Sequence, residues 1–155
     1  MKILKKILLV LLAAFLLIQF YRPEKNSAEY RDVASFEAET KPAPEIKTIL
    51  ENNCYDCHSN KTEYPWYAEI APVSFVIAHH VEEGNEHFNV SKWDTYTLKK
   101  KDHKLEELIE EVEEGEMPEN GYALIHGKMT QEEKEALLNW ANKARENYAV
   151  GDDIQ

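Results

Sequence analysis

Two cysteines and a histidine lie within five consecutive residues, and this cluster constrains the chain more than any other feature. The sequence CYDCH places Cys54 and Cys57 three positions apart, and His58 follows at once. A C-x-x-C-H pattern is the attachment signature of c-type haem. Two intervening residues let one backbone turn place both sulfurs over the vinyl-bearing edges of a porphyrin. The next residue then lies under the iron, where the imidazole of His58 can serve as the proximal ligand.

Parts of the same pattern also occur in other kinds of site. Zinc favours a C-x-x-C pair with distant histidines, and His79, His80 and His87 are candidates. Redox dithiols of the C-x-x-C type typically occur in βαβ folds, and the sequence shows no βαβ pattern. Disulfide scaffolds of exported proteins usually join several distant pairs, whereas this chain has two cysteines in all. The motif therefore favours one covalent haem per chain, with zinc as the alternative.

The N-terminus has the character of an export signal that stays attached. Three lysines fall within the first six residues, and residues 7–20 are apolar except for Gln19. The stretch from Ile3 to Tyr21 has 19 residues, which is enough for a membrane span. No small-residue cleavage site follows it. We therefore predict a single-pass signal anchor over residues 1–21 in the cytoplasmic membrane, with the remaining chain in the periplasm by the positive-inside rule.

The chain is strongly acidic. Its formal net charge is −11, which becomes −14 without the three N-terminal lysines. Contacts with phosphates need lysine and arginine, so the charge argues against a nucleic acid as partner. An acidic surface instead suits a basic redox protein or a membrane respiratory complex.

The remaining chain predicts a linker followed by an all-α domain. Residues 22–43 are polar, are flanked by prolines and show no sustained periodicity, as in a tether. Residues 44–150 are predicted to form a helical domain with long loops, because no segment alternates like a strand. Its helices are expected from Pro44 into the cysteine pair, from Pro72 to Gly84, around Trp93, from Leu105 to Gly115, and after the capping box Thr130–Glu133.

Met117 is the predicted ligand on the second side of the iron. It lies 59 residues after His58, in a polar loop between two predicted helices, where a methionine is poorly explained as core. A thioether is a soft donor that raises the reduction potential of haem iron. Met129 is a weaker alternative. His80 is a stronger alternative. It shares one helical stripe with Val73, Val76 and Ile77, and this stripe is expected to face the interior.

Beyond these patterns, the sequence resembles the haem-binding domain family of c-type cytochrome-like proteins that is typical of Bacteroidetes. The likeness covers residues 44 to about 147 and lies in CHSNKTEYPWYAEIAPVSFVIAHHVEEG, FNVSKWDTY and IEEGEMPENGYALIHGKMTQEEKEALLNWA. The resemblance implies a cytochrome c-like helical fold, with thioether bonds at Cys54 and Cys57 and His58 as proximal ligand. It also implies that Met117, in the G-x-M-P element, is the axial methionine.

Two main classes of function follow. Electron transfer is the first, since iron held by a histidine and a methionine is six-coordinate and has no open position for a substrate. The second is a haem enzyme or sensor, peroxidase-like or gas-binding, in which Met117 binds weakly and His79 or His80 acts on the distal side. A zinc-binding or other non-redox module is a third reading. The sequence favours an electron carrier over an enzyme.

Overall fold

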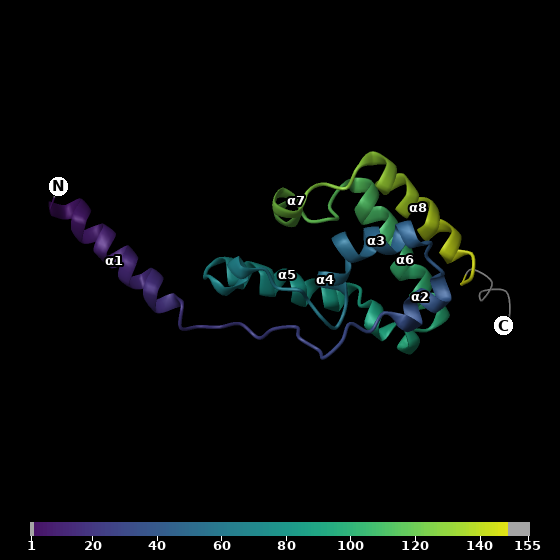
Figure 1. Cartoon of the computed structure of the whole chain (residues 1–155), viewed down its shortest axis with the longest axis horizontal. Helices are drawn as coiled ribbons and strands as arrows, with labels where there is room; N and C mark the ends of the chain where they lie inside the picture. The colour runs from purple at the N-terminus through teal and green to yellow at the C-terminus, as the bar shows by residue number, and fades with distance from the viewer. Residues whose placement is uncertain (1, 149–155) are drawn as a thin grey trace.

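The computed structural model describes residues 2–148, apart from the side chains of Asn120, Leu124 and His126, and within this part it contains helices and no strands (Figure 1). This confirms the all-α prediction; the predicted domain end at residue 150 lies outside the described residues. The elements are α1 (Lys2–Ile18), α2 (Ala34–Thr40), α3 (Pro44–Asn53), α4 (Tyr55–His58), η1 (Trp66–Glu69), α5 (Val73–His87), η2 (Val90–Thr95), α6 (Leu98–Glu114), α7 (Asn120–His126) and α8 (Gln131–Arg145).

Local sequence explains where the longer helices begin and end. The Thr97 hydroxyl caps the first turn of α6, and Gly115 ends that helix in a left-handed conformation with φ of 81°. Thr130 and Glu133 form a reciprocal capping box at the start of α8. Both the glycine stop and the capping box were predicted, and both are confirmed.

The core lies where α6 packs against α8, α3 contacts α8, and α2 contacts η2. At its centre the Phe36 ring meets four other aromatic rings edge-on, with centroid distances between 4.9 and 6.5 Å. Such edge-to-face pairs add to the free energy gained from burying the rings. The largest fully buried side chains include Phe36, Leu50, Tyr55, Trp93, Leu105 and Leu137.

The segment predicted as a linker, residues 22–43, lies against the domain. Its helix α2 places Phe36 in the core with no exposed surface. Ahead of α2, Ser27 pairs with Lys61 in an isolated antiparallel bridge. The packed unit therefore begins well before Pro44, and this stretch is more than a tether.

Helix α1 projects from one end of the body (Figure 1). It spans 17 residues and ends at Ile18, so the helix is shorter than the segment predicted as an anchor, and its side chains are exposed along its length. In residues 2–148, no helix combines the length and apolar character that crossing a membrane requires.

Candidate functional site

The three residues of the C-x-x-C-H motif are brought together by a single turn of helix. Cys54 ends α3, where its N–H donates to the Leu50 carbonyl at 2.9 Å. Its own carbonyl accepts from the N–H groups of Cys57, at 3.1 Å, and His58, at 2.9 Å. Both cysteines are partly buried free thiols within the described chain. The predicted helix into the motif is confirmed, and the turn α4 carries both sulfurs and the imidazole.

The orientation of the His58 ring is set by α5. Its Nδ1 lies 2.9 Å from the carbonyl oxygen of Gly84 and 2.9 Å from that of Phe88. Carbonyl oxygens only accept hydrogen bonds, so Nδ1 carries the proton and Nε2 keeps its lone pair. Metal-ligating histidines commonly use their second nitrogen in this way, because the bond fixes the tautomer and the plane of the ring. The His58 ring is therefore prepared to donate through Nε2.

Burial favours the ligating form of the same imidazole. Desolvation lowers the pKa of His58, although the two carbonyl bonds oppose this in part. A histidine with a lowered pKa is neutral at physiological pH, and the neutral imidazole is the form that binds a metal.

The close approach of α5 to α4 depends on Gly84. A Cβ built at this position would lie 2.8 Å from the Cys57 carbonyl oxygen and 3.1 Å from the Cys57 Cβ. The prediction that Gly84 ends its helix is wrong, because α5 continues to His87 and Gly84 lies buried within it. Because Gly84 has no side chain, α5 can pack close to α4, and the Gly84 carbonyl can reach His58.

Residues from the predicted linker hold the motif from the other direction. The Arg31 guanidinium pairs with the Asp56 carboxylate inside the CYDCH sequence, and its Nε donates to the Lys61 carbonyl at 3.1 Å. The Asn26 amide donates to the Ser59 carbonyl at 2.8 Å and to the Thr62 hydroxyl at 3.0 Å. This clamp, formed by Asn26 and Arg31, was not predicted from the sequence. Isolated polar residues in an aperiodic stretch do not indicate which residues they will contact.

Burial makes the Cys54 and Cys57 thiols hard to deprotonate. Desolvation raises the pKa of Cys54 to about 12, and desolvation with the Asp56 and Glu119 carboxylates raises that of Cys57 to about 11. Redox-active dithiols instead lower the pKa of one thiol to create a thiolate at neutral pH. The pair therefore does not resemble a redox dithiol, which agrees with the helical fold.

The loop that carries Met117 turns back toward α5. The Met117 N–H donates to the Glu111 carbonyl at 3.1 Å, and the residue is 37% exposed. Two residues later, the Glu119 carboxylate lies 3.7 Å from Nδ1 of His80. Glu119 is also close enough to Cys57 to raise its pKa. The structure therefore brings the Met117 loop, the His80 region of α5 and the motif to one part of the molecule.

The predicted interior stripe of α5 is displaced around the helix. Ser74, Val81 and Gly84 are the buried residues, whereas Val73 and Val76 are exposed. Successive residues of a helix are about 100° apart, so the buried face is rotated by roughly one residue from the predicted one. The rotation follows from the packing of Gly84 on α4. His80 lies at the edge of the buried face, with its side chain 36% exposed.

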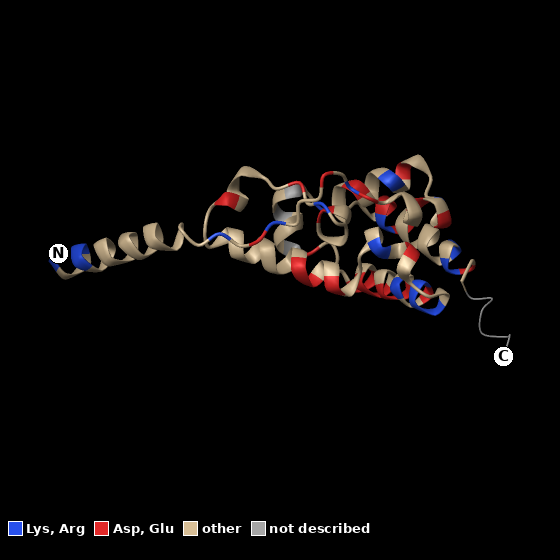
Figure 2. Cartoon of the chain, turned by 90° about the horizontal axis from the view of Figure 1, so that it is seen from below, with Lys and Arg blue, Asp and Glu red and all other residues tan. Residues whose placement is uncertain are grey.

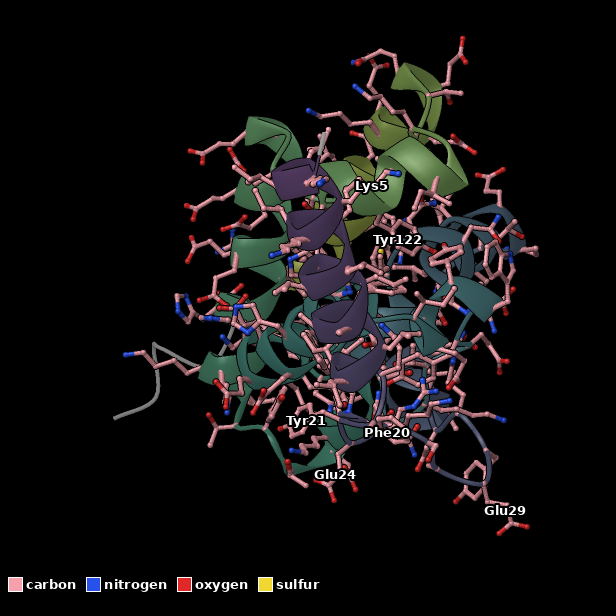
Figure 3. All side chains as sticks on the ribbon, turned by 90° about the vertical axis from the view of Figure 1, so that its left-hand side faces the viewer. Lys5, Phe20, Tyr21, Glu24, Glu29 and Tyr122 are labelled. Atoms are coloured by element: carbon pink, nitrogen blue, oxygen red, sulfur yellow. The ribbon has the colours of Figure 1, made fainter. Side chains whose placement is uncertain are left out.

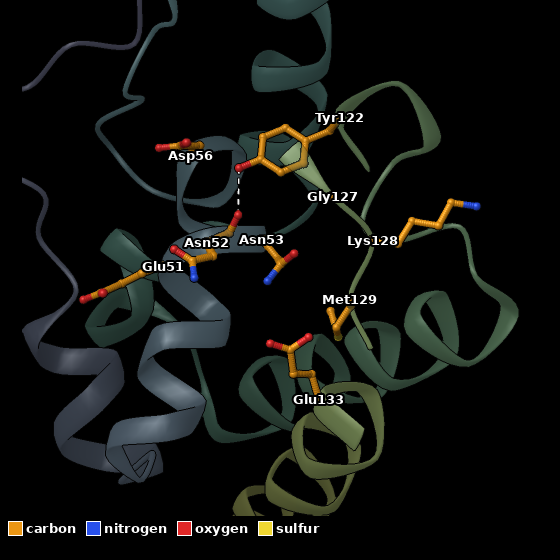
Figure 4. Close-up of a pocket in the computed structure, with 9 residues that line it drawn as sticks. All are labelled: Glu51, Asn52, Asn53, Asp56, Tyr122, Gly127, Lys128, Met129 and Glu133. Carbon is orange, nitrogen blue, oxygen red and sulfur yellow. Dashed lines mark hydrogen bonds between the residues drawn. The ribbon is translucent and has the colours of Figure 1, made fainter. Parts of the chain in front are cut away.

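Met129 differs from Met117 in its surroundings. Met129 packs against the hydrophobic core, so it has a structural role that Met117 lacks. It also lines an open pocket of about 500 Å³ next to the motif (Figure 4), where the Tyr122 hydroxyl donates to the Asn52 carbonyl at 2.8 Å. The lining residues are Glu51, Asn52, Asn53, Asp56, Tyr122, Gly127, Lys128, Met129 and Glu133.

The histidines proposed for zinc do not converge. His79 pairs with Glu83 on the same helix at 3.4 Å, and His80 faces Glu119. In the part of the chain that the structure describes, no three His, Cys, Asp or Glu side chains are grouped as a metal site. The zinc alternative gains no support from this geometry.

Comparison with known families gives a match to the haem-binding domain over residues 13–143. The chain belongs to the haem-binding domain family. Searches of curated proteins and of solved structures gave no match.

The donor residues of this family member fit a haem group. One turn carries two thiols beside an imidazole whose Nδ1 is fixed and whose Nε2 is available. Exposed apolar side chains suited to a macrocycle occur on α5 and on the Met117–α7 stretch, at Val76, Met117 and Ile125.

Proposed function

We propose that this haem-binding protein is a membrane-tethered, monohaem c-type cytochrome that carries single electrons. The observation that supports it most is the His58 ring, whose Nδ1 is fixed by two carbonyls directly beside the Cys54 and Cys57 thiols. The Cys54 and Cys57 thiols would each add across one vinyl group of the haem, with the carbon–sulfur bond formed at one vinyl carbon and the thiol hydrogen passed to the other. When bound, the haem iron supplies one-electron exchange between its ferric and ferrous states.

The protein side of this function is to bind and orient. His58 would bind the iron through Nε2, and the Gly84 and Phe88 carbonyls keep its ring plane fixed. Met117 is the proposed sixth ligand, because its partly exposed thioether lies on the loop that returns to α5. Ligation by both residues would leave no position for a substrate, as a carrier requires.

The proposed location is the outer face of the cytoplasmic membrane. The lysines at the start of the chain, followed by a helix that exposes apolar side chains along its length, support an uncleaved attachment by residues 3–21. Membrane-fraction protein that begins near Met1 is expected. A soluble periplasmic form that begins between residues 20 and 30 would contradict the attachment.

The proposed partner is a basic redox protein or a membrane respiratory complex. Acidic residues gather along one edge of the body (Figure 2). Those exposed on α5 and α6 include Glu82, Glu83, Glu86, Glu110, Glu111, Glu113 and Glu114. We expect electron transfer to a basic partner to slow as salt rises, because screening shortens the reach of charges to about 8–10 Å near physiological salt.

A variant pair tests this charge steering. Glu110→Gln with Glu113→Gln should flatten the salt dependence of the electron-transfer rate more than Glu29→Gln with Glu45→Gln, which lie ahead of α2 and on α3. A salt-independent rate in the unmutated protein would show that the acidic charge does not steer the partner.

A haem enzyme or sensor is the second candidate, and two observations favour it. Met117 does not pack into the core, and His80 lies beside Glu119 near the same loop. If Met117 binds the iron weakly, His80 is placed to serve as a ligand or as an acid–base group on that side.

Extraction of the haem tests the proposed attachment. The full chain is produced with a cytochrome c maturation system, denatured and treated with acid acetone. Haem should stay with the polypeptide, and its pyridine haemochrome should show the spectrum of two thioethers. Extractable haem, or stoichiometric zinc in its place, would contradict the proposal.

A further inference from the structure

The end of α1 is fastened to the η1 turn instead of leading into a loose tether. The Gln19 amide makes two hydrogen bonds to the backbone of Ala71: Nε2 donates to its carbonyl at 3.1 Å, and Oε1 accepts from its N–H at 3.0 Å. The Tyr21 ring packs edge-on against Phe75, with 5.5 Å between centroids. These contacts join two segments about fifty residues apart in sequence, and they place the base of α1 beside η1.

Ion pairs strengthen the same junction. Glu69, in η1, lies 3.4 Å from the Arg22 guanidinium and also pairs with the Lys25 ammonium. Lys25 in turn lies over the Tyr64 ring, 5.3 Å from its centroid. Two cations and several aromatic rings therefore share the region where α1 meets the body.

Large apolar side chains are exposed around this junction. Trp66 is 76% exposed, whereas Trp93 has no exposed surface. Phe20 is 86% exposed and Tyr21 69% exposed, both at the opposite end of α1 from Lys5 (Figure 3). Ile70 and Val73 extend the patch on the body. Contiguous exposed apolar surface of this kind marks a contact with another molecule or with a membrane.

The continuity of this patch with α1 identifies its occupant. The apolar side chains of α1 are exposed along its length, and it carries no charge after Lys6 (Figure 2). A lipid environment that covers α1 would reach Phe20, Tyr21 and Trp66 at its base. Tryptophan and tyrosine favour the membrane–water interface, because an apolar ring there carries a polar group that faces water. The cations of Arg22 and Lys25, next to this base, suit anionic lipid headgroups.

We propose that the η1 turn docks on the lipid bilayer surface through Trp66, at the point where α1 enters the lipid. The junction formed by Gln19 and Glu69 then holds the haem domain in one orientation against the membrane. This inference rests on the proposed membrane attachment. It adds a second, surface contact that limits how the domain presents its haem site and its acidic edge to a partner.

Hydroxyl-radical footprinting of the full-length, haem-loaded chain tests this docking. The chain is placed in nanodiscs of phosphatidylcholine and phosphatidylglycerol, one chain per disc, and oxidation is measured by mass spectrometry. Trp66 is compared with Leu98, an exposed side chain at the start of α6. The test variant Gln19→Ala with Glu69→Ala removes the junction. The control variant Gln131→Ala with Glu135→Ala removes an exposed Gln–Glu pair, joined at 2.8 Å, on α8.

We expect the ratio of Trp66 to Leu98 oxidation to be severalfold lower in the unmutated chain and the control than in the junction variant. Equally high ratios in all three, with the chain still in the discs, would overturn docking and leave membrane attachment intact. Equally low ratios would overturn the role of the junction. A chain that does not enter discs would overturn both. Protection of Trp66 only in discs that hold two chains would assign the patch to a second copy and overturn the lipid contact.

Discussion

The two proposed iron ligands, His58 and Met117, are held in opposite ways. His58 lies on a helical turn between two packed helices, and two carbonyls at 2.9 Å fix its ring. Met117 lies on a loop, fixed through its backbone N–H to Glu111, with its side chain partly exposed. The fold therefore fixes the imidazole of His58 from two directions, whereas it holds the proposed second ligand only through the backbone of a loop.

Removing one cysteine should have the largest effect, because it acts on the attachment itself. Cys54→Ala or Cys57→Ala should give little mature protein, and what forms should carry a single thioether, visible in the pyridine haemochrome spectrum. Ser74→Ala is the control: Ser74 is small and buried on α5, and its hydroxyl has no hydrogen-bond partner among the described residues. Normal yield of two-thioether protein from either cysteine variant would contradict the account.

Removing Met117 should change the iron's electronic state without preventing attachment. Met117→Ala should lower the reduction potential, because a donor that favours ferrous iron is lost, and CO should bind readily. Met129→Ala is the control, since Met129 packs against the core; it should leave the spectrum unchanged. If Met117→Ala leaves the spectrum unchanged while His80→Ala converts it to high spin, the second ligand is His80.

Substitution of Gly84 tests how tightly α5 packs against α4 beside His58. Gly84→Ala forces a Cβ to within 2.8 Å of the Cys57 carbonyl, and overpacking of this kind costs about 1–3 kcal/mol in the free energy of unfolding. Gly121→Ala, in α7, is the matched control, because its Cβ meets the flexible Glu119 side chain at 2.9 Å. Urea unfolding should show the larger loss for Gly84→Ala; equal losses would mean that α4 and α5 can separate at little cost.

Arg31 tests the clamp from the N-terminal segment. Its ion pair with Asp56 is largely buried, with the two side chains 20% and 19% exposed. Arg31→Ala should therefore lower the free energy of unfolding by about 1.5–3 kcal/mol, as expected for hydrogen bonds to charged groups. Lys61→Ala breaks the more exposed pair with Glu63 in the same loop and should cost about 0–1 kcal/mol. Denaturant midpoints that move equally would show that residues 22–33 do not hold the motif.

Much of this architecture was predictable, because it follows from local pattern. The helix into Cys54, the stop at Gly115 and the Thr130 capping box depend on residues close in sequence. The clamp by Asn26 and Arg31 was not predictable, because its partners lie about thirty residues away. The buried face of α5 differs from the predicted one for the same reason. Helical periodicity locates an apolar stripe, but the contact of Gly84 with Cys57 decides which face is covered.

The near-infrared spectrum of the oxidised, unmutated protein tests the central claim most directly. A carrier with His58 and Met117 as ligands should show a sulfur-to-iron charge-transfer band, and its reduced form should bind CO slowly. Absence of that band together with fast CO binding would contradict the account, because the iron would have an open position and the protein would be a haem enzyme or sensor.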